Sequence, residues 1–287
     1  MSFNRDPWSP SFTVRRMPAW PCPTCGLGTL QFEVETEPSK GGTKQAEVTP
    51  VLCRRSTGET RRDWNHEAWE PDWIRGVFVA LLRCNRSECA EAVSVSGSYR
   101  MTGVERLVSA DDQWEEEYTP LHFHPAPPLL RLPAKCPEAV SAALQRAWAA
   151  YWGDPGACAN HLRTSIERLM DHIGIPRIKA LDHRIQAYEK LEPERAQELM
   201  AIKWLGNSGS HGDEGLTQED ILDALEVLEH TLAEILVSRT KERQAALQRL
   251  RAKHDPNHGK LPQTATKKKK EKAAPVPDST EKKPSGS

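Results

Sequence analysis

Two pairs of cysteines form the clearest chemical pattern in the sequence. Cys22-Pro-Thr-Cys25 is followed by Gly26, and Cys84 and Cys89 form a second pair beyond a long insertion. A tight turn closed by glycine lets two thiolates of one pair reach the same ion, and structural zinc takes four such ligands. The pairs therefore predict one Zn²⁺ held by all four cysteines. Four thiolates leave no open position for water, so this zinc would be structural and not catalytic.

The alternative is that the four cysteines are unrelated buried thiols, although the proline and glycine of the first pair serve a turn and not a core. Cys53 lies in the insertion without a partner nearby, and we expect a core thiol there. Cys136 and Cys158 lie in the second half of the chain, where a small buried apolar residue explains them. His122 and His124 share one face of an extended segment, which fits either a metal site or an ordinary linker strand.

The second pattern is the segment from Lys203 through Gly206 and Asn207 to His211. Its glycines and serines predict that a helix ends at Gly206 and that a loop follows, which would present side chains to a partner. His211 is an acid or base group near neutral pH. The segment is either a site for a ligand or reaction, or a structural junction in which Asn207 and His211 cap and pin the helix end.

The sequence resembles the bacterial family called domain of unknown function 4145. The residues that carry this resemblance are those of the segment above, together with Arg163 and Glu167, four positions apart on an earlier helix. The resemblance covers about residues 125–237, and a zinc ribbon often precedes this domain. The family in turn resembles the helical HEPN superfamily (higher eukaryotes and prokaryotes nucleotide-binding). Active members of that superfamily are metal-independent RNases of toxin–antitoxin, restriction and phage-defence systems. The resemblance implies a HEPN-like helical bundle that binds nucleic acid, RNA in particular, and that forms a homodimer through its helices.

The superfamily motif is an arginine, a polar residue, three further residues and a histidine. Asn207 and His211 match it, but Gly206 stands in place of the arginine. In RNA cleavage the histidine moves a proton while the guanidinium neutralises charge on the phosphate. Only Arg163 or Lys203 from neighbouring turns could supply that charge, and lysine lacks the planar fork of arginine. The sequence therefore favours a binding module over two alternatives, an endoribonuclease using His211 and a structural adaptor.

The elements that must position these residues change type near residue 125. Before it, short β-branched runs at residues 29–34, 76–82 and 92–96 predict strands. After it, caps and apolar stripes predict five helices. These helices span 137–151, 155–174, 180–191 and 193–206, with the last starting at 217. The predicted fold class is α+β: a β-rich zinc-ribbon domain over 1–124, a helical bundle with a projecting last helix over 125–254, and a tail over 255–287.

The tail differs from the body in charge. The net charge is −1, but residues 259–287 carry eight lysines against three carboxylates, a net of +5, which leaves −6 for residues 1–258. The run Lys267, Lys268, Lys269 and Lys270 cannot form a core, so we expect a disordered tail that either contacts nucleic-acid phosphates or only solubilises the chain.

The sequence also bears on location and partners. It contains no uninterrupted apolar stretch of about 18 residues and no apolar signal core near its start. Cysteines in metal-type pairs suit a reducing compartment. We therefore expect a cytoplasmic protein without membrane contact, whose partner is nucleic acid or another protein of a defence system.

Overall fold

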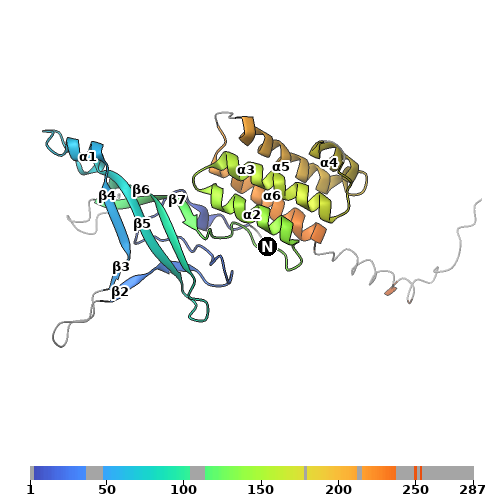
Figure 1. Cartoon of the computed structure of the whole chain (residues 1–287), viewed down its shortest axis with the longest axis horizontal. Helices are drawn as coiled ribbons and strands as arrows, with labels where there is room; N and C mark the ends of the chain where they lie inside the picture. Colours follow the sequence, from blue (N-terminus) through green and yellow to red (C-terminus); the bar gives the residue numbers. More distant parts are fainter. Residues whose placement is uncertain are drawn as a thin grey trace, which may run out of the picture. The chain divides into compact units, whose positions relative to one another are not determined.

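The computed structural model describes residues 3–36, 48–103, 114–177, 180–211 and 215–236, together with 249, 250 and 253. At positions 35, 36, 48, 49 and 209–211 it describes the backbone alone. Met1–Arg239 forms one compact unit, and Thr240–Ser287 is the second. The predicted lysine run 267–270 and the tail lie outside the described residues (Figure 1).

The first half of the chain forms an antiparallel sheet centred on β5 (Arg75–Cys84). Its other strands are β1 (Leu30–Phe32), β4 (Leu52–Ser56), β6 (Ala92–Gly103) and β7 (Trp114–His124). β6 pairs with one side of β5 and with β7, while β1 and β4 pair with opposite ends of the other side of β5. β2 (Val34–Thr36) and β3 (Val48–Pro50) form a separate two-stranded sheet. The three predicted strands are confirmed.

β5 shows why its sequence forms a strand. Phe78, Ala80 and Leu82 are buried on one face, and the alternate residues from Val77 to Leu81 are exposed on the other. This period of two is the pattern of a half-buried strand. β7 was expected only at its His122–His124 end, because consecutive glutamates and Pro120 interrupt the alternation before it. A register shift between Ser96 and Gly97 of β6 also lies in its pairing with β7.

The first half also contains three short helical segments, η1 (Asp6–Trp8), α1 (Gly58–Asp63) and η2 (Pro71–Trp73). The second half contains α2 (Glu138–Tyr151), α3 (Pro155–His172), α4 (Leu181–Glu189), α5 (Pro193–His211) and α6 (Gln218–Leu236). α2, α3 and α4 begin and end close to the predicted limits, and α6 begins close to its predicted start, because such limits depend on local sequence; the predicted projecting part of the last helix lies largely outside the described residues. The Asp154 side chain, for example, accepts a hydrogen bond from the backbone N–H of Ala157 (2.8 Å). No described helix is long and apolar enough to cross a membrane.

The predicted end of the fourth helix at Gly206 is wrong, because α5 continues through Asn207 to His211. Gly206 lies where α5 packs against α3. A Cβ atom at this position would stand 2.6 Å from Cβ of Arg163 and 3.0 Å from the carbonyl oxygen of Ala159. A glycine within a helix is unfavourable by about 1 kcal/mol relative to alanine. Here it allows two helices to approach closely, so it does not mark a helix end.

Aromatic side chains join the sheet to the helices. The ring of Trp20 lies 4.9 Å from that of Phe123 on β7 and 6.0 Å from that of Trp152, which follows α2. The rings of Phe123 and Trp152 lie 4.7 Å apart. All three side chains are buried in one hydrophobic core that continues from the sheet into the helices. Aromatic contacts of this kind add to the free energy gained by burying the rings.

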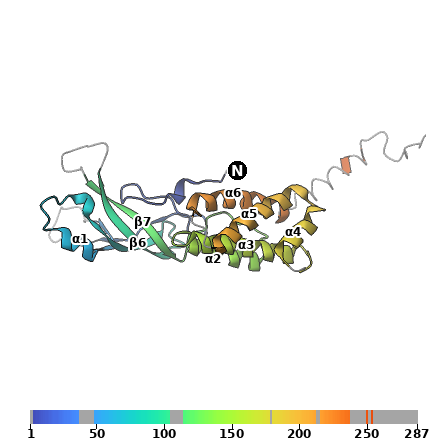
Figure 2. The ribbon, with the colours of Figure 1, turned by 90° about the horizontal axis from the view of Figure 1, so that it is seen from above.

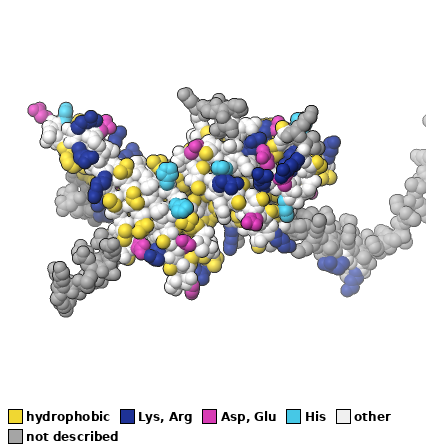
Figure 3. All heavy atoms as spheres, viewed as in Figure 1, with side chains coloured by type: hydrophobic (Ala, Val, Ile, Leu, Met, Phe, Trp, Pro, Cys, Tyr) yellow, Lys and Arg dark blue, Asp and Glu magenta, His cyan; other side chains and the backbone are white. Residues whose placement is uncertain are grey.

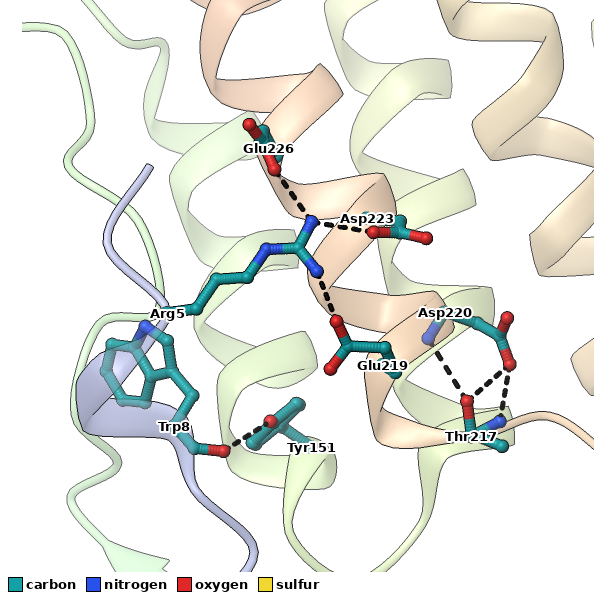
Figure 4. A network of polar contacts seen from close by, with 8 residues as sticks. All are labelled: Arg5, Trp8, Tyr151, Thr217, Glu219, Asp220, Asp223 and Glu226. Atoms are coloured by element: carbon teal, nitrogen blue, oxygen red, sulfur yellow. Dashed lines mark hydrogen bonds and ion pairs between the residues drawn. The ribbon is translucent and has the colours of Figure 1, made fainter. Parts of the chain in front are cut away.

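The N-terminal segment also links the two halves. Its Phe12 exchanges backbone hydrogen bonds with Tyr118 of β7 (2.9 and 2.8 Å). Trp8 is buried, and its carbonyl oxygen accepts a hydrogen bond from the Tyr151 hydroxyl (3.2 Å). Figure 2 shows this segment running beside α6. There Arg5 forms ion pairs with three carboxylates, namely Glu219, Asp223 and Glu226 (Figure 4).

Candidate functional site

The four paired cysteines lie together at one end of β5. Their Sγ atoms are all within 4.8 Å of one another. The Sγ atoms of Cys22 and Cys89 are 3.7 Å apart, and those of Cys25 and Cys84 are 3.8 Å apart. Four thiolates at about 2.3 Å from a tetrahedral zinc would be about 3.8 Å from one another. The predicted grouping is therefore confirmed, and these four cysteines can bind a metal ion.

Glycines shape the first cysteine turn. Gly26 has φ +61°, a conformation that favours glycine, and its N–H donates to the carbonyl oxygen of Cys22 (2.9 Å). A Cβ atom on Gly28 would stand 2.5 Å from Sγ of Cys84. The N–H of Gly28 also donates to Sγ of Cys25 (3.4 Å). Gly28 was not singled out in the sequence, because its role depends on a cysteine distant along the chain.

Asn85 fastens the two cysteine turns to each other. Its Oδ1 accepts from the N–H of Thr29 (3.0 Å), and its Nδ2 donates to Oγ1 of Thr29 (3.1 Å). The backbone N–H of Asn85 also donates to the carbonyl oxygen of Thr29 (3.0 Å). These bonds hold the residue after Cys84 against the strand that follows Cys25. Sequence reasoning missed Asn85, whose only signal was its place next to a candidate ligand.

The pKa shifts differ among the four cysteines, and the pKa of Cys22, Cys84 and Cys89 is raised while that of Cys25 is lowered. The N–H groups of Gly28 and Leu27 lower the pKa of the Cys25 thiol to about 6, because they stabilise its thiolate. Burial raises the pKa of Cys22 and of Cys84. Several thiolates packed this closely repel one another, and a bound cation removes that repulsion.

The other cysteines and the histidine pair stay apart from this cluster. The prediction of a core thiol at Cys53 is wrong: its side chain is exposed, because it lies on the outward face of β4. Cys158 is buried, which raises its pKa, and Cys136 is half-buried. His122 and His124 are exposed on β7. Within the described ranges no third metal-binding side chain joins these two histidines.

The junction of α3 and α5 holds the other candidate residues. Nη2 of Arg163 lies 3.2 Å from Oε1 of Glu167, so these two side chains pair along α3. The buried Lys203 has its Nζ 2.6 Å from Oδ1 of Asp182 on α4, an ion pair without the alignment of a hydrogen bond. Both candidate phosphate contacts are therefore engaged by carboxylates.

The remaining residues of this junction follow along α5. Asn207 is half-buried one turn beyond Lys203, and His211 is the last residue of the helix. The Cδ atom of Arg163 would lie 3.2 Å from a Cβ atom at position 206. The aliphatic part of Arg163 thus runs beside Gly206, the position at which the superfamily motif has its own arginine.

A network of charged side chains around the buried Arg184 was missed by sequence reasoning. Asp171 of α3 forms ion pairs with Arg177 (2.7 Å) and with the buried Arg184 of α4 (2.8 Å). Hydrogen bonds from Arg177 and Arg184 lower the pKa of Asp171 to about 2. Arg184 also donates to the carbonyl oxygen of Ile175 (2.8 Å). The network fastens the loop between α3 and α4, a pairing that no spacing in the sequence indicates.

Comparison with known families finds two matches, in separate parts of the chain. Residues 145–253, which contain the second half of α2 and all of α3–α6, match a family described as a domain of unknown function (DUF4145). Residues 10–126, which contain the sheet and all four clustered cysteines, match a second family described as a domain of unknown function (DUF8608). No curated protein and no solved structure matches the chain. The chain is therefore similar to DUF8608 over residues 10–126 and to DUF4145 over residues 145–253, and the resemblance to the latter is confirmed.

Proposed function

We propose that this chain is a zinc-containing binding module that engages nucleic acid or a partner protein in a bacterial defence or nucleic-acid-processing system. The sulfur spacing of Cys22, Cys25, Cys84 and Cys89 supports zinc, the usual ion of four-thiolate structural sites. Four thiolates complete its coordination, so its role is to hold the two turns together. The DUF8608 region then acts as a zinc ribbon, and the DUF4145 region as a HEPN-like bundle.

We favour binding over catalysis because both candidate phosphate contacts, Arg163 and Lys203, are paired with carboxylates. A cleavage site needs a positive group aimed at the phosphate where charge develops. Lys203 is buried against Asp182, and Arg163 is paired with Glu167. Gly206 packs against α3 and has no side chain to replace them.

The phosphate contacts that we propose for nucleic acid are Lys267–Lys270. Electrostatic binding of this kind weakens steeply with salt and depends little on sequence. We expect the full chain to bind mixed single-stranded RNA with a steep salt dependence. A chain lacking residues 255–287 should bind more weakly and with a shallower dependence. Equal affinity of the two chains would contradict the nucleic-acid proposal and favour a protein partner.

A metal-independent endoribonuclease is the second candidate, and one observation favours it. The stem of Arg163 lies directly beside position 206, so an arginine of α3 passes the site of the missing arginine. Wild type and His211→Ala should be compared on a mixed RNA pool in the presence of a chelator. Cleavage by wild type that His211→Ala abolishes would overturn the binding-module proposal, and no cleavage by either would support it.

The proposed homodimer and defence role have separate tests. Light scattering of the full chain measures its mass in solution, and a monomer would contradict pairing of two bundles.

Neighbouring genes that encode a helicase, nuclease or antitoxin would support the defence role, and purely metabolic neighbours would contradict it.

A further inference from the structure

The insertion between the cysteine pairs ends in a tip formed by α1, η2 and the segment that joins them (Figure 1). Residues 63–73, which read DWNHEAWEPDW, contain three tryptophans and four carboxylates but no lysine or arginine. Tryptophan is highly buried on average in folded proteins. None of these three indoles belongs to the buried core, and Trp64 is 52% exposed. The tip thus presents aromatic surface with no role in the packing of the core.

Two of the indoles line a small pocket. Its volume is about 250 Å³, and it is bounded by Trp64, Trp69 and Ile74. This is smaller than the roughly 300–1,000 Å³ of sites for drug-sized ligands, so it suits a compact head group. Nε1 of Trp69 is buried, and no hydrogen-bond partner for it exists in the part of the chain that the structure describes. The pocket wall is therefore aromatic and apolar.

The backbone of the tip is fastened, which keeps the pocket in shape. The Thr60 hydroxyl accepts a hydrogen bond from the N–H of Arg75 (3.0 Å), which joins α1 to the start of β5. The N–H of Thr60 donates to the Thr57 hydroxyl, which caps α1. The ring of His66 packs on that of Trp73, with centroids 5.4 Å apart. These contacts thus hold the backbone on both sides of residues 63–73 and the ring of Trp73.

The tip carries a net negative charge, because residues 58–73 contain five carboxylates and only two arginines, Arg61 and Arg62. The four carboxylates of residues 63–73 take part in none of the ion pairs between described residues. They are Asp63, Glu67, Glu70 and Asp72. The faces of indole rings attract cations, and uncompensated carboxylates add to this attraction. An apolar wall among negatively charged residues favours the binding of a cation that is weakly hydrated.

We propose that the Trp64–Trp69 pocket binds a quaternary ammonium group. Such a group carries full charge but no N–H, so it leaves no unmet hydrogen bonds against an apolar wall, and aromatic sites recognise it by its contact with ring faces. The primary ammonium of lysine is strongly hydrated and would lose more on entering. A free choline-like molecule and a trimethylated lysine side chain supply the same head group. This site is independent of the binding-module proposal.

A nucleobase stacked on the same indoles is the rival occupant. Arg61 and Arg62 lie on α1 just before Trp64, and Figure 3 shows basic as well as acidic side chains at the α1 end of the sheet. The four carboxylates of residues 63–73 would repel the phosphates that must accompany a base. The charge of the pocket segment therefore favours the ammonium group.

The first experiment compares charged and neutral probes on the full-length protein. Tetramethylammonium, choline and 3,3-dimethylbutan-1-ol, the uncharged isostere of choline, are titrated while the indole N–H signals are followed by NMR. We expect the two ammonium probes to shift the Trp64 and Trp69 signals and choline to bind about tenfold more tightly than its isostere, the ratio that about 1.4 kcal/mol gives. Equal affinity for the isostere, or no shift with either cation, would overturn the proposal.

Two further titrations test where the quaternary ammonium group comes from and whether a nucleobase binds instead. A trimethyl-lysine peptide that binds more tightly than both choline and its unmethylated form would assign the head group to a protein partner. Choline that binds at least as well as that peptide would assign it to a small molecule. A single-stranded oligonucleotide that shifts the two indole signals when the ammonium probes do not would overturn the proposal in favour of base stacking.

Variants then locate the site. Trp64→Leu should weaken choline binding about tenfold, whereas Trp204→Leu, which changes an exposed tryptophan of α5, should leave it unchanged. The double variant Glu67→Gln and Glu70→Gln keeps the shape of the tip and should weaken binding about threefold. Glu189→Gln, on the surface of α4, is the matched control. Unchanged binding in both tip variants would overturn the assignment to this pocket.

Discussion

Gly206 of α5 packs directly against Arg163 of α3, so closely that a Cβ atom at position 206 would lie 2.6 Å from that of Arg163. The residue that suggested a helix end in the sequence is a contact between two helices in the folded chain. The same contact places the stem of Arg163 directly beside position 206. Both effects follow from the approach of α3 to α5.

We predict that Gly206→Ala lowers the free energy of unfolding. Alanine gains about 1 kcal/mol in helix propensity, but its methyl group would force α3 and α5 apart, and overpacking of this kind costs about 1–3 kcal/mol. We expect a net loss of about 1 kcal/mol, and a larger loss for Gly206→Arg. Gly58→Ala, in α1 with no atom within 4 Å of the new Cβ, is the control for urea unfolding. A more stable Gly206→Ala would contradict the close contact.

Loss of one metal ligand should destabilise the sheet and the helices together. We expect purified protein to carry about one zinc per chain, and Cys84→Ser to lose it, with a fall in stability of more than about 4 kcal/mol. Trp20, near the first cysteine pair, packs against Trp152 beside the helices, so one transition should report both halves. Metal analysis and circular dichroism measure the two effects.

Cys53→Ser is the control for that experiment, because Cys53 is exposed and apart from the cluster. It should keep both the zinc and the stability of wild type. Freshly reduced wild-type protein without metal would refute the zinc proposal.

The two partners of the Lys203–Asp182 pair should respond unequally to substitution. Asp182→Asn leaves the buried ammonium of Lys203 without its counter-charge and should cost about 1–3 kcal/mol. Lys203→Met leaves Asp182, which is 42% exposed and can be hydrated, and should change stability by less than about 1 kcal/mol. Chemical denaturation of both variants tests this order.

Lys203→Met also separates the two functional candidates. A buried, paired lysine makes no phosphate contact, so its loss should leave RNA affinity unchanged. A marked loss of RNA binding or cleavage in this stable variant would show that Lys203 contacts phosphate.

Asp171 should make stability depend on acid pH. Its pKa is about 2 in the folded chain against 3.8 for the free group, so its contribution is complete above about pH 4 and is lost as the pH falls towards 2. The shift corresponds to about 2 kcal/mol. Asp171→Asn should therefore be less stable than wild type at pH 7, and the difference should shrink at pH 2.5. Glu189→Gln should show no such convergence, and a constant difference for Asp171→Asn would contradict the pKa shift.

Local patterns were enough to determine much of this protein from its sequence. The cysteine pairs predicted a cluster that the structure contains, because ligand spacing and turn residues act over a few positions. Helix caps such as Asp154 and the alternation in β5 likewise depend on near neighbours. Most of strand β7 was not predicted from the sequence, because glutamates and a proline obscure its alternation.

Only the tertiary structure decided which distant residues meet. It buried Lys203 against Asp182, exposed Cys53, and placed Gly206 against Arg163. It also brought Trp64 and Trp69 together around one pocket. The identity of a residue sets its chemistry, but burial and partners depend on packing between elements far apart in the chain. For that reason the sequence by itself could name Gly206 as unusual and yet assign it to a helix end.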